Sequence, residues 1–218
     1  MSEEEAPPPP PLPVASLAEP GRALRRSRSA LVLESVLIVA SVLLGFALSS
    51  WSERREEGRL TAAALASFRS EIQANLAALE RVQPKHAAFA ERLAAAARRS
   101  HADRTAFDVF VELMPEGGID APSLGEAAWQ AALSTGALRL FDYDVAAALS
   151  EAYFVQRATV LPTVSILQDR FLAEANFDPA SAPVIVRVHS MVLNELAGQE
   201  AYLIDVYRRT LDRLEQTD

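Results

Sequence analysis

The stretch from Ala30 to Trp51, ALVLESVLIVASVLLGFALSSW, constrains the fold of this chain more than any other feature. Its 22 residues form a helix of roughly 33 Å at about 1.5 Å per residue, which matches a hydrocarbon layer about 30 Å thick. No other run in the sequence is both long enough and apolar enough to cross a bilayer. The sequence therefore predicts three parts: a tail over 1–29, a transmembrane helix over 30–51 and a domain over 52–218.

The tail over 1–29 opens with Glu3, Glu4 and Glu5 and continues with a proline run from Pro7 to Pro11, so we expect it to be disordered. Arginines are denser before the apolar run than after it: Arg22, Arg25, Arg26 and Arg28 precede it, and Arg54, Arg55 and Arg59 follow it. This bias predicts a cytoplasmic N-terminus and a domain outside the cytoplasm. The apolar run exceeds the roughly 7 to 15 residues of a signal peptide core, which favours an uncleaved anchor.

Five residues of the apolar run are spaced 4, 3, 4 and 4 apart and so share one helical stripe: Glu34, Ile38, Ser41, Gly45 and Ser49. The small residues of this stripe allow two backbones to approach closely. Glu34 either reaches the headgroups or faces another helix. The stripe is a candidate transmembrane association face, with a second copy of the chain or another membrane protein as the partner.

The run from Glu34 to Arg55 resembles the opening of an uncharacterised family of bacterial single-pass membrane proteins. In that family a Glu begins a Gly-containing apolar helix, which ends in a Trp followed by acidic and basic residues. The matching positions here are Glu34, Gly45, Trp51, Glu53 and Arg54. A second similarity covers Trp129, Gly136, Leu138, the triplet Phe141-Asp142-Tyr143, Leu149-Ser150, Tyr153 and Gln156. The resemblance implies a shared architecture in the bacterial inner membrane and implies no activity.

Beyond Trp51 the sequence is rich in Ala, and apolar residues recur at steps of 3 and 4, which indicates helices. We therefore predict an all-α fold, in which the transmembrane helix continues into an extracytoplasmic bundle of four to five helices. The last helix is expected over about 182–216, with this apolar stripe: Val188, Met191, Val192, Leu196, Leu203, Val206, Leu211 and Leu214.

Several residues predict where helices begin and end. Pro84 is expected to interrupt the first helix, either as the first-turn residue of a second segment over about 84–100 or as a kink. Ser123 and Glu126 have capping-box spacing and predict a helix start, which Gly136 terminates in a left-handed conformation. Asp142 is a candidate N-cap for the next helix, and Pro162 is expected to kink it.

Motifs for chemistry are missing from the sequence. There is no cysteine, no phosphate-binding glycine loop and no G-x-S-x-G element. The three histidines, His86, His101 and His189, lack metal-binding spacing, and the pair Asp142 and Asp144 is interpreted as helix capping. The net charge of −8 argues against binding to nucleic acid. We expect no enzyme activity, no cofactor and no metal.

The second candidate site is an aromatic cluster at a helix hairpin: Trp129, Phe141, Tyr143, Tyr153 and Gln156. Helical spacing is expected to bring Trp129 and Leu133 against Tyr153. Core packing and a ligand pocket between helices are both open interpretations.

The leading functional hypothesis is a protein anchored in the bilayer of the bacterial inner membrane. Its periplasmic helical domain then acts in protein interaction or assembly within the cell envelope. A ligand-sensing bundle that acts through a partner is the first alternative. A membrane-tethered hydrolase is the second, and the missing motifs argue against it.

Overall fold

The computed structural model describes residues 28–99, 103–116 and 118–216. Among these residues none lies in a strand, and the predicted all-α fold class is confirmed. The chain divides into two units, Met1–Trp51 and Ser52–Asp218. Residues 1–27 of the predicted tail lie outside the described residues, as does His101.

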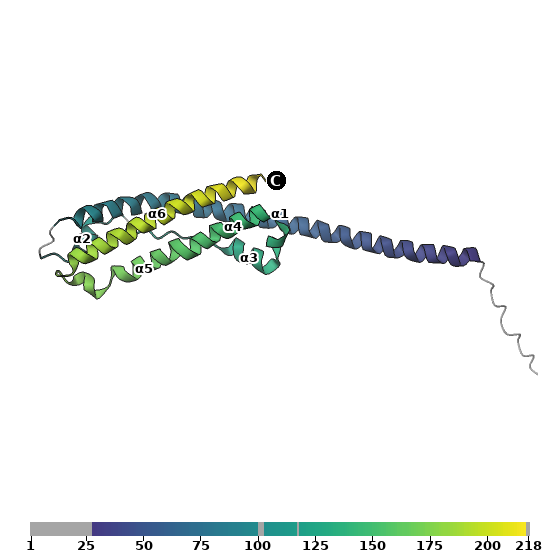
Figure 1. Cartoon of the computed structure of the whole chain (residues 1–218), viewed down its shortest axis with the longest axis horizontal. Helices are drawn as coiled ribbons and strands as arrows, with labels where there is room; N and C mark the ends of the chain where they lie inside the picture. The colour runs from purple at the N-terminus through teal and green to yellow at the C-terminus, as the bar shows by residue number, and fades with distance from the viewer. Residues whose placement is uncertain (1–27, 100–102, 117, 217–218) are drawn as a thin grey trace, which may run out of the picture. The chain divides into compact units, whose positions relative to one another are not determined.

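The helices are α1 (Arg28–Ala96), α2 (Ala106–Leu113), α3 (Ala127–Thr135), α4 (Tyr143–Val155), α5 (Leu161–Phe171) and α6 (Ala182–Glu215) (Figure 1). A π-helical turn at Gln156–Val160 joins α4 to α5, so residues 143–171 form one helical segment. Short 3₁₀ helices occupy Ala137–Leu140 and Glu174–Phe177. With α4 and α5 counted as one segment, the described residues contain five, at the upper end of the predicted four to five.

The first part of α1 is long and apolar enough to cross a membrane. Its most apolar 18-residue window has a mean hydropathy of 2.5, and none of that window is buried. Large side chains along it are well exposed, for example Leu37 at 60% and Leu44 at 71%. The helix continues past Trp51 without a break, as the sequence predicts, and ends at Ala96.

In the unit Ser52–Asp218, α1 and α6 each bury a stripe with alternating spacings of 3 and 4. On α1 the stripe is Leu65, Phe68, Ile72, Asn75, Leu79, Val82, His86, Phe89, Leu93 and Ala96. On α6 it is Val186, His189, Leu193, Leu196, Glu200, Leu203, Tyr207, Thr210 and Leu214. This spacing is typical of long helices that pack at small crossing angles.

Contacts between the long helices establish their directions. Near one end of the bundle the Arg69 guanidinium of α1 donates to the carbonyl of Leu214 on α6, and farther along α1 the His86 ring contacts Glu200. As the residue numbers rise on α1 they fall on α6, so the two helices are antiparallel, and Figure 1 shows α6 beside the teal part of α1.

The segment α4–α5 runs parallel to α1. Tyr153 of α4 contacts Glu71, and Gln156, at the following π-helical turn, contacts Asn75. The two short helices α2 and α3, with their loops, form the connection that makes this parallel arrangement possible.

The expected start of a new helix at Pro84 is wrong, because α1 includes Pro84 and ends only at Ala96. A proline inside a helix costs about 3 kcal/mol. Here the neighbouring turns on both sides are packed in the core, since Val82 is 0% and His86 is 1% exposed. Tertiary packing along the whole stripe therefore outweighs the local penalty.

The predicted capping box over 123–126 is also wrong. Helix α3 begins at Ala127, and Glu126 makes no side-chain cap hydrogen bond. Instead, the Glu71 carboxylate of α1 accepts from the backbone N–H of Ala128 at 3.1 Å. A long-range cap replaces the local one because the start of α3 packs directly against α1.

The other helix signals have mixed outcomes. Gly136 has φ 72° and donates its N–H to the carbonyls of Ala132 and Leu133, which is the predicted left-handed end of α3. Asp142 occupies the N-cap position of α4 but makes no side-chain cap hydrogen bond. Pro162 lies in the first turn of α5, directly after the π-helical turn.

The stripe predicted for α6 is partly in the wrong phase. Val188 and Met191 are 36% and 66% exposed, whereas His189 and Glu200 are 7% and 0% exposed. A stripe selected by hydrophobicity misses buried polar residues, and these polar residues occupy core positions of α6.

A candidate ligand pocket between helices

The candidate transmembrane face lies along the exposed part of α1. Glu34, Ile38 and Ser41 line one shallow surface groove of this helix. The Ser41 hydroxyl donates to the Leu37 carbonyl at 2.7 Å, so its hydrogen bond is made within the helix. A Cβ added at Gly45 would meet no neighbouring side chain within 4 Å, and Ser49 is exposed.

Of the predicted aromatic cluster, four members are buried: Trp129, Phe141, Tyr153 and Gln156. The Trp129 and Tyr153 rings stack at 5.2 Å between centroids. Tyr143 is 84% exposed and does not belong to the cluster. Leu133 is 51% exposed. Both residues lie on the outer faces of their helices.

Phe68 of α1 completes this cluster. Its ring lies 6.0 Å from that of Phe141 and 5.9 Å from that of Tyr153. Because Tyr153 and Phe68 are both 0% exposed, the centre of the cluster is packed with side chains. The geometry supports core packing over a pocket at this position.

Beside the aromatic rings lies a hydrogen-bonded polar network, and sequence reasoning missed its centre, Asn75. The Asn75 side chain accepts from the N–H of Gly125 at 2.7 Å and donates to its carbonyl at 2.9 Å. Gln156 donates to the same carbonyl at 3.2 Å and accepts from the Tyr207 hydroxyl at 2.6 Å. These contacts hold the loop before α3 against α1 and the π-helical turn, and Tyr207 of α6 contacts that turn through Gln156.

The tyrosines of this region are hydrogen-bond donors. Burial, and then the hydrogen bond from its hydroxyl to Glu71 at 2.6 Å, raise the pKa of Tyr153 above its ordinary value. Burial likewise raises the pKa of Tyr207. Both hydroxyls therefore remain protonated at physiological pH and donate to fixed acceptors, which is a structural role.

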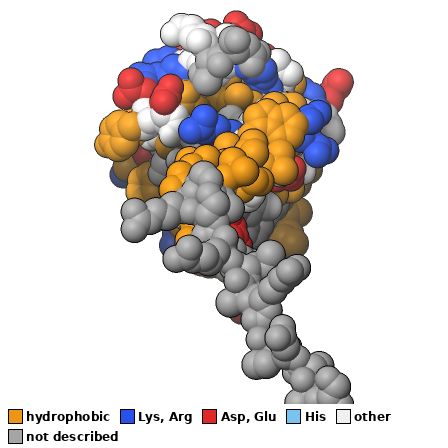
Figure 2. All heavy atoms as spheres, turned by 90° about the vertical axis from the view of Figure 1, so that its right-hand side faces the viewer, with side chains coloured by type: hydrophobic (Ala, Val, Ile, Leu, Met, Phe, Trp, Pro, Cys, Tyr) orange, Lys and Arg blue, Asp and Glu red, His pale blue; other side chains and the backbone are white. Residues whose placement is uncertain are grey.

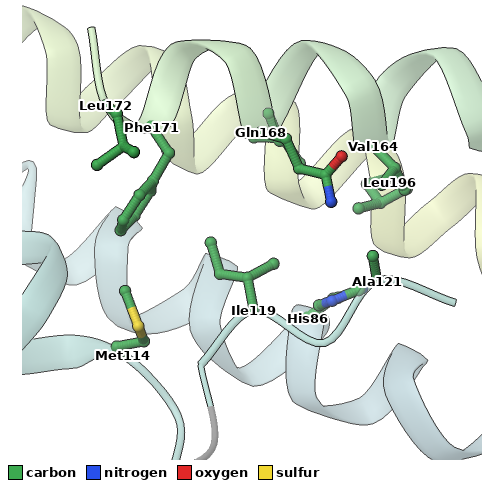
Figure 3. Close-up of a pocket in the computed structure, with 10 residues that line it drawn as sticks. His86, Met114, Ile119, Ala121, Val164, Gln168, Phe171, Leu172 and Leu196 are labelled. Carbon is green, nitrogen blue, oxygen red and sulfur yellow. The ribbon is translucent and has the colours of Figure 1, made fainter.

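A separate cavity of about 250 Å³ lies farther along the bundle. Its walls come from α1, α5, α6 and the loop after α2, as Figure 3 shows. The lining side chains are mostly apolar: Met114, Ile119, Ala121, Val164, Leu167, Phe171, Leu172 and Leu196, together with His86 and Gln168. Leu172 is 70% exposed, so the cavity reaches the surface of the protein.

His86 is the buried polar residue of this cavity. Its Nδ1 lies 2.9 and 3.0 Å from the two carboxylate oxygens of Glu200, and both side chains are almost fully buried. The other ring nitrogen, Nε2, is buried and has no hydrogen-bond partner. A buried polar atom without a partner is costly, and here it belongs to a side chain that lines an open cavity.

The loop residues of the cavity are held by ion pairs. Asp120, between Ile119 and Ala121, lies 3.4 Å from the Lys85 ammonium and 3.8 Å from the Arg81 guanidinium. All three side chains are at least 40% exposed, so each pair contributes on the order of 0 to 1 kcal/mol. The contacts orient this wall of the cavity and can be broken at little cost.

One sequence signal could have located His86 and Glu200. The spacing of 3 and 4 that begins at Leu65 continues through Pro84 and places His86 on the core face of α1. The corresponding spacing on α6 places Glu200 in the core. A core position for an ionisable residue predicts a buried partner, but it does not identify which residue that partner is.

Surface charge, metal-binding geometry and comparisons with known proteins give three further findings. On the face that Figure 2 shows, acidic and basic side chains are interspersed, with hydrophobic side chains between them. Within the described residues no group of three or more His, Asp or Glu side chains has metal-binding geometry. In comparisons with protein-family models, curated proteins and solved structures, nothing matches this chain.

Proposed function

We propose that this chain is a single-pass membrane protein whose helical domain binds a small, mostly apolar molecule. The observation that carries this proposal is the cavity of about 250 Å³, which is lined mostly by apolar side chains together with His86 and Gln168. Pockets of this kind, apolar with few polar groups, are typical of small-molecule sites. Apolar cavities of about 150 Å³ bind benzene, so this one has room for a somewhat larger molecule.

The membrane part of the proposal rests on the exposed apolar part of α1. Side chains such as Leu43 at 63% and Phe46 at 68% exposure are unfavourable in water and favourable in lipid. The arginine bias favours a cytoplasmic N-terminus, and the family resemblance favours the bacterial inner membrane with a periplasmic domain. A phosphatase or fluorescent-protein fusion at Asp218 tests this orientation.

Binding is tested with the full chain in lipid nanodiscs and a panel of small apolar molecules. A ligand at a hundred times its Kd stabilises the protein by about 2.7 kcal/mol, which raises the thermal unfolding midpoint. Ala121→Leu fills the cavity and is expected to abolish the shift. Ala131→Leu, on the exposed surface of α3, is the matched control and keeps it. An unchanged shift in Ala121→Leu would contradict the location of the site.

Protein interaction or assembly is the second candidate function, and one feature of α6 favours it. Val184, Val188 and Met191 are 64%, 36% and 66% exposed and follow spacings of 4 and 3. They form an apolar stripe on the outer face of the bundle. Crosslinking in native membranes followed by pull-down tests this function, and Met191→Glu is expected to reduce any specific crosslink.

Self-association through the transmembrane face is tested in a membrane reporter assay. Gly45→Ile places a bulky side chain where the two backbones approach and is expected to reduce association; an unchanged signal would eliminate this face as the interface. The hydrolase alternative has no support from a catalytic motif, and a broad hydrolase screen of the full chain checks it.

A further inference from the structure

The cavity between the helices is apolar and buried at its floor and reaches water at its rim. This inference rests on the proposed function, because it concerns the same cavity. At the floor Leu167 is 4% and Leu196 is 1% exposed. At the rim Leu172 is 70% exposed and Gln168 is exposed as well. A molecule in the cavity therefore meets buried hydrocarbon at one end and water at the other.

The rim carries the accessible polar side chain of the lining, Gln168. The other lining residues, apart from His86, are Ala, Val, Leu, Ile, Met and Phe. The two ring nitrogens of His86 are not open to a ligand, because Nδ1 contacts Glu200 and Nε2 is buried. In Figure 3 the Gln168 carboxamide points into the space that the lining residues surround. No group of the described residues forms a hydrogen bond with it, so its oxygen and its N–H groups can bond a ligand.

The lining also offers no counter-charge to an ionic ligand. Of the ten lining residues only His86 is ionisable, and its ring lies 2.9 Å from a carboxylate oxygen of Glu200. Asp120, on the loop that forms one wall, pairs with Lys85 and Arg81. An ion that leaves water for apolar surroundings without a partner is strongly disfavoured. These surroundings favour an uncharged ligand.

We propose that the cavity takes an uncharged amphiphile. Its apolar body packs against Leu167 and Leu196 at the floor, and one amide or hydroxyl group exchanges hydrogen bonds with the Gln168 carboxamide at the rim. A carboxamide both donates and accepts, and so do an amide and a hydroxyl group, which makes them its complementary partners. In this orientation the polar group of the ligand keeps part of its contact with water.

The methionines of the chain make binding at the cavity directly observable. The sequence has three, Met1, Met114 and Met191. Met114 lines the cavity, whereas Met191 is 66% exposed and lies outside the lining. The full chain, with carbon-13 in its methionine methyl groups, is titrated in lipid nanodiscs. The Met114 signal gives the Kd at the cavity, and the Met191 signal is the internal control for non-specific binding.

Four probes separate apolar packing from recognition of the polar group: toluene, hexanamide, hexanoate and hexylammonium. Hexanamide is expected to bind about tenfold more tightly than either ion, because neither ion finds a counter-charge. Gln168→Leu is expected to weaken hexanamide about two- to tenfold through the lost hydrogen bond and not to weaken toluene. Gln73→Leu, at an exposed position of α1 outside the cavity lining, is the matched control and leaves both affinities unchanged.

The outcomes separate this inference from the proposed function. An unchanged affinity for hexanamide in Gln168→Leu, or equal weakening of hexanamide and toluene, overturns recognition by Gln168. Binding of either ion as tightly as hexanamide overturns the preference for an uncharged ligand. In each case a Met114 shift with toluene leaves the pocket intact. Absence of a Met114 shift with toluene, hexanamide and the wider panel of apolar molecules overturns the pocket itself.

Discussion

Two buried polar clusters lie on the same face of α1, about three turns apart, and they differ in one respect. Around Asn75 the side-chain nitrogen and oxygen atoms of Asn75, Gln156 and Tyr207 all have hydrogen-bond partners within the protein. Around His86 one nitrogen has none, and a cavity lies beside it. The first cluster serves the fold, although the neighbouring Trp129 Nε1 also has no hydrogen-bond partner. The second cluster is the better candidate for a ligand site because a cavity lies beside it.

The surroundings of the two clusters agree with this distinction. Large aromatic rings fill the space near Asn75, with Trp129 and Tyr153 stacked at 5.2 Å. Near His86 one wall of the cavity is a loop, in which Asp120 makes exposed ion pairs and Ile119 is partly buried against the core. A filled and rigid environment suits structure, and an unfilled one with a weakly held wall suits entry of a ligand.

The largest effect is expected from replacing only one member of the His86–Glu200 pair. His86→Leu leaves Glu200 buried without its partner and is expected to lower the free energy of unfolding by about 3 to 5 kcal/mol. His86→Leu/Glu200→Leu is expected to recover most of this loss. Thermal unfolding followed by tryptophan fluorescence measures both. Equal destabilisation of the single and double variants would show that the charge pairing is not the cause.

A smaller loss of stability is expected from replacing Asn75, the centre of the first cluster. Asn75→Leu leaves the N–H of Gly125 without its partner and removes a donor to the Gly125 carbonyl, which lowers the free energy of unfolding by about 2 to 3 kcal/mol. Leu76→Ala, at the adjacent partly buried position of α1, is a control for the loss of packing alone. The distinguishing measurement is hydrogen exchange at Gly125, which rises in Asn75→Leu and not in the control.

The hydroxyl of Tyr153 is expected to contribute less. Tyr153→Phe removes its bond to Glu71 but leaves Glu71 bonded to the N–H of Ala128, so the loss is about 1 to 2 kcal/mol. Tyr202→Phe is the matched control, because that hydroxyl also contacts a glutamate, Glu151, at an exposed position. A loss in the control as large as in Tyr153→Phe would contradict the effect of burial.

The smallest effect concerns a third buried polar residue, His189, and pH. Burial lowers the pKa of His189 below its ordinary value of 6.5, and the nearby charge of Arg170 lowers it further. The unfolded chain therefore binds a proton first as pH falls, and stability decreases below about pH 6.5. The slope from one group is less than about 1.4 kcal/mol per pH unit. His189→Leu is expected to flatten unfolding curves recorded between pH 7.5 and 5.5.

Local signals in the sequence predicted the elements well where packing agreed with them. The all-α class, the long apolar helix and the left-handed end at Gly136 all followed from spacing and composition. The predictions of a new helix at Pro84 and of a capping box over 123–126 were wrong. Packing of its buried stripe keeps α1 helical through Pro84, and Glu71 caps α3. In both cases a contact distant in sequence outweighed a local preference.

The sequence by itself determined that the chain has an apolar helix long enough to cross a membrane and a domain of amphipathic helices. Asn75, His86 and Glu200 also follow the spacing of the buried stripes, but their core positions became evident only in the structure. Only the tertiary structure decided that His86 meets Glu200, 114 residues away, beside a cavity. The physical reason is that periodicity specifies how deeply a residue is buried, whereas its partner depends on the direction and register of the helices that pack against it.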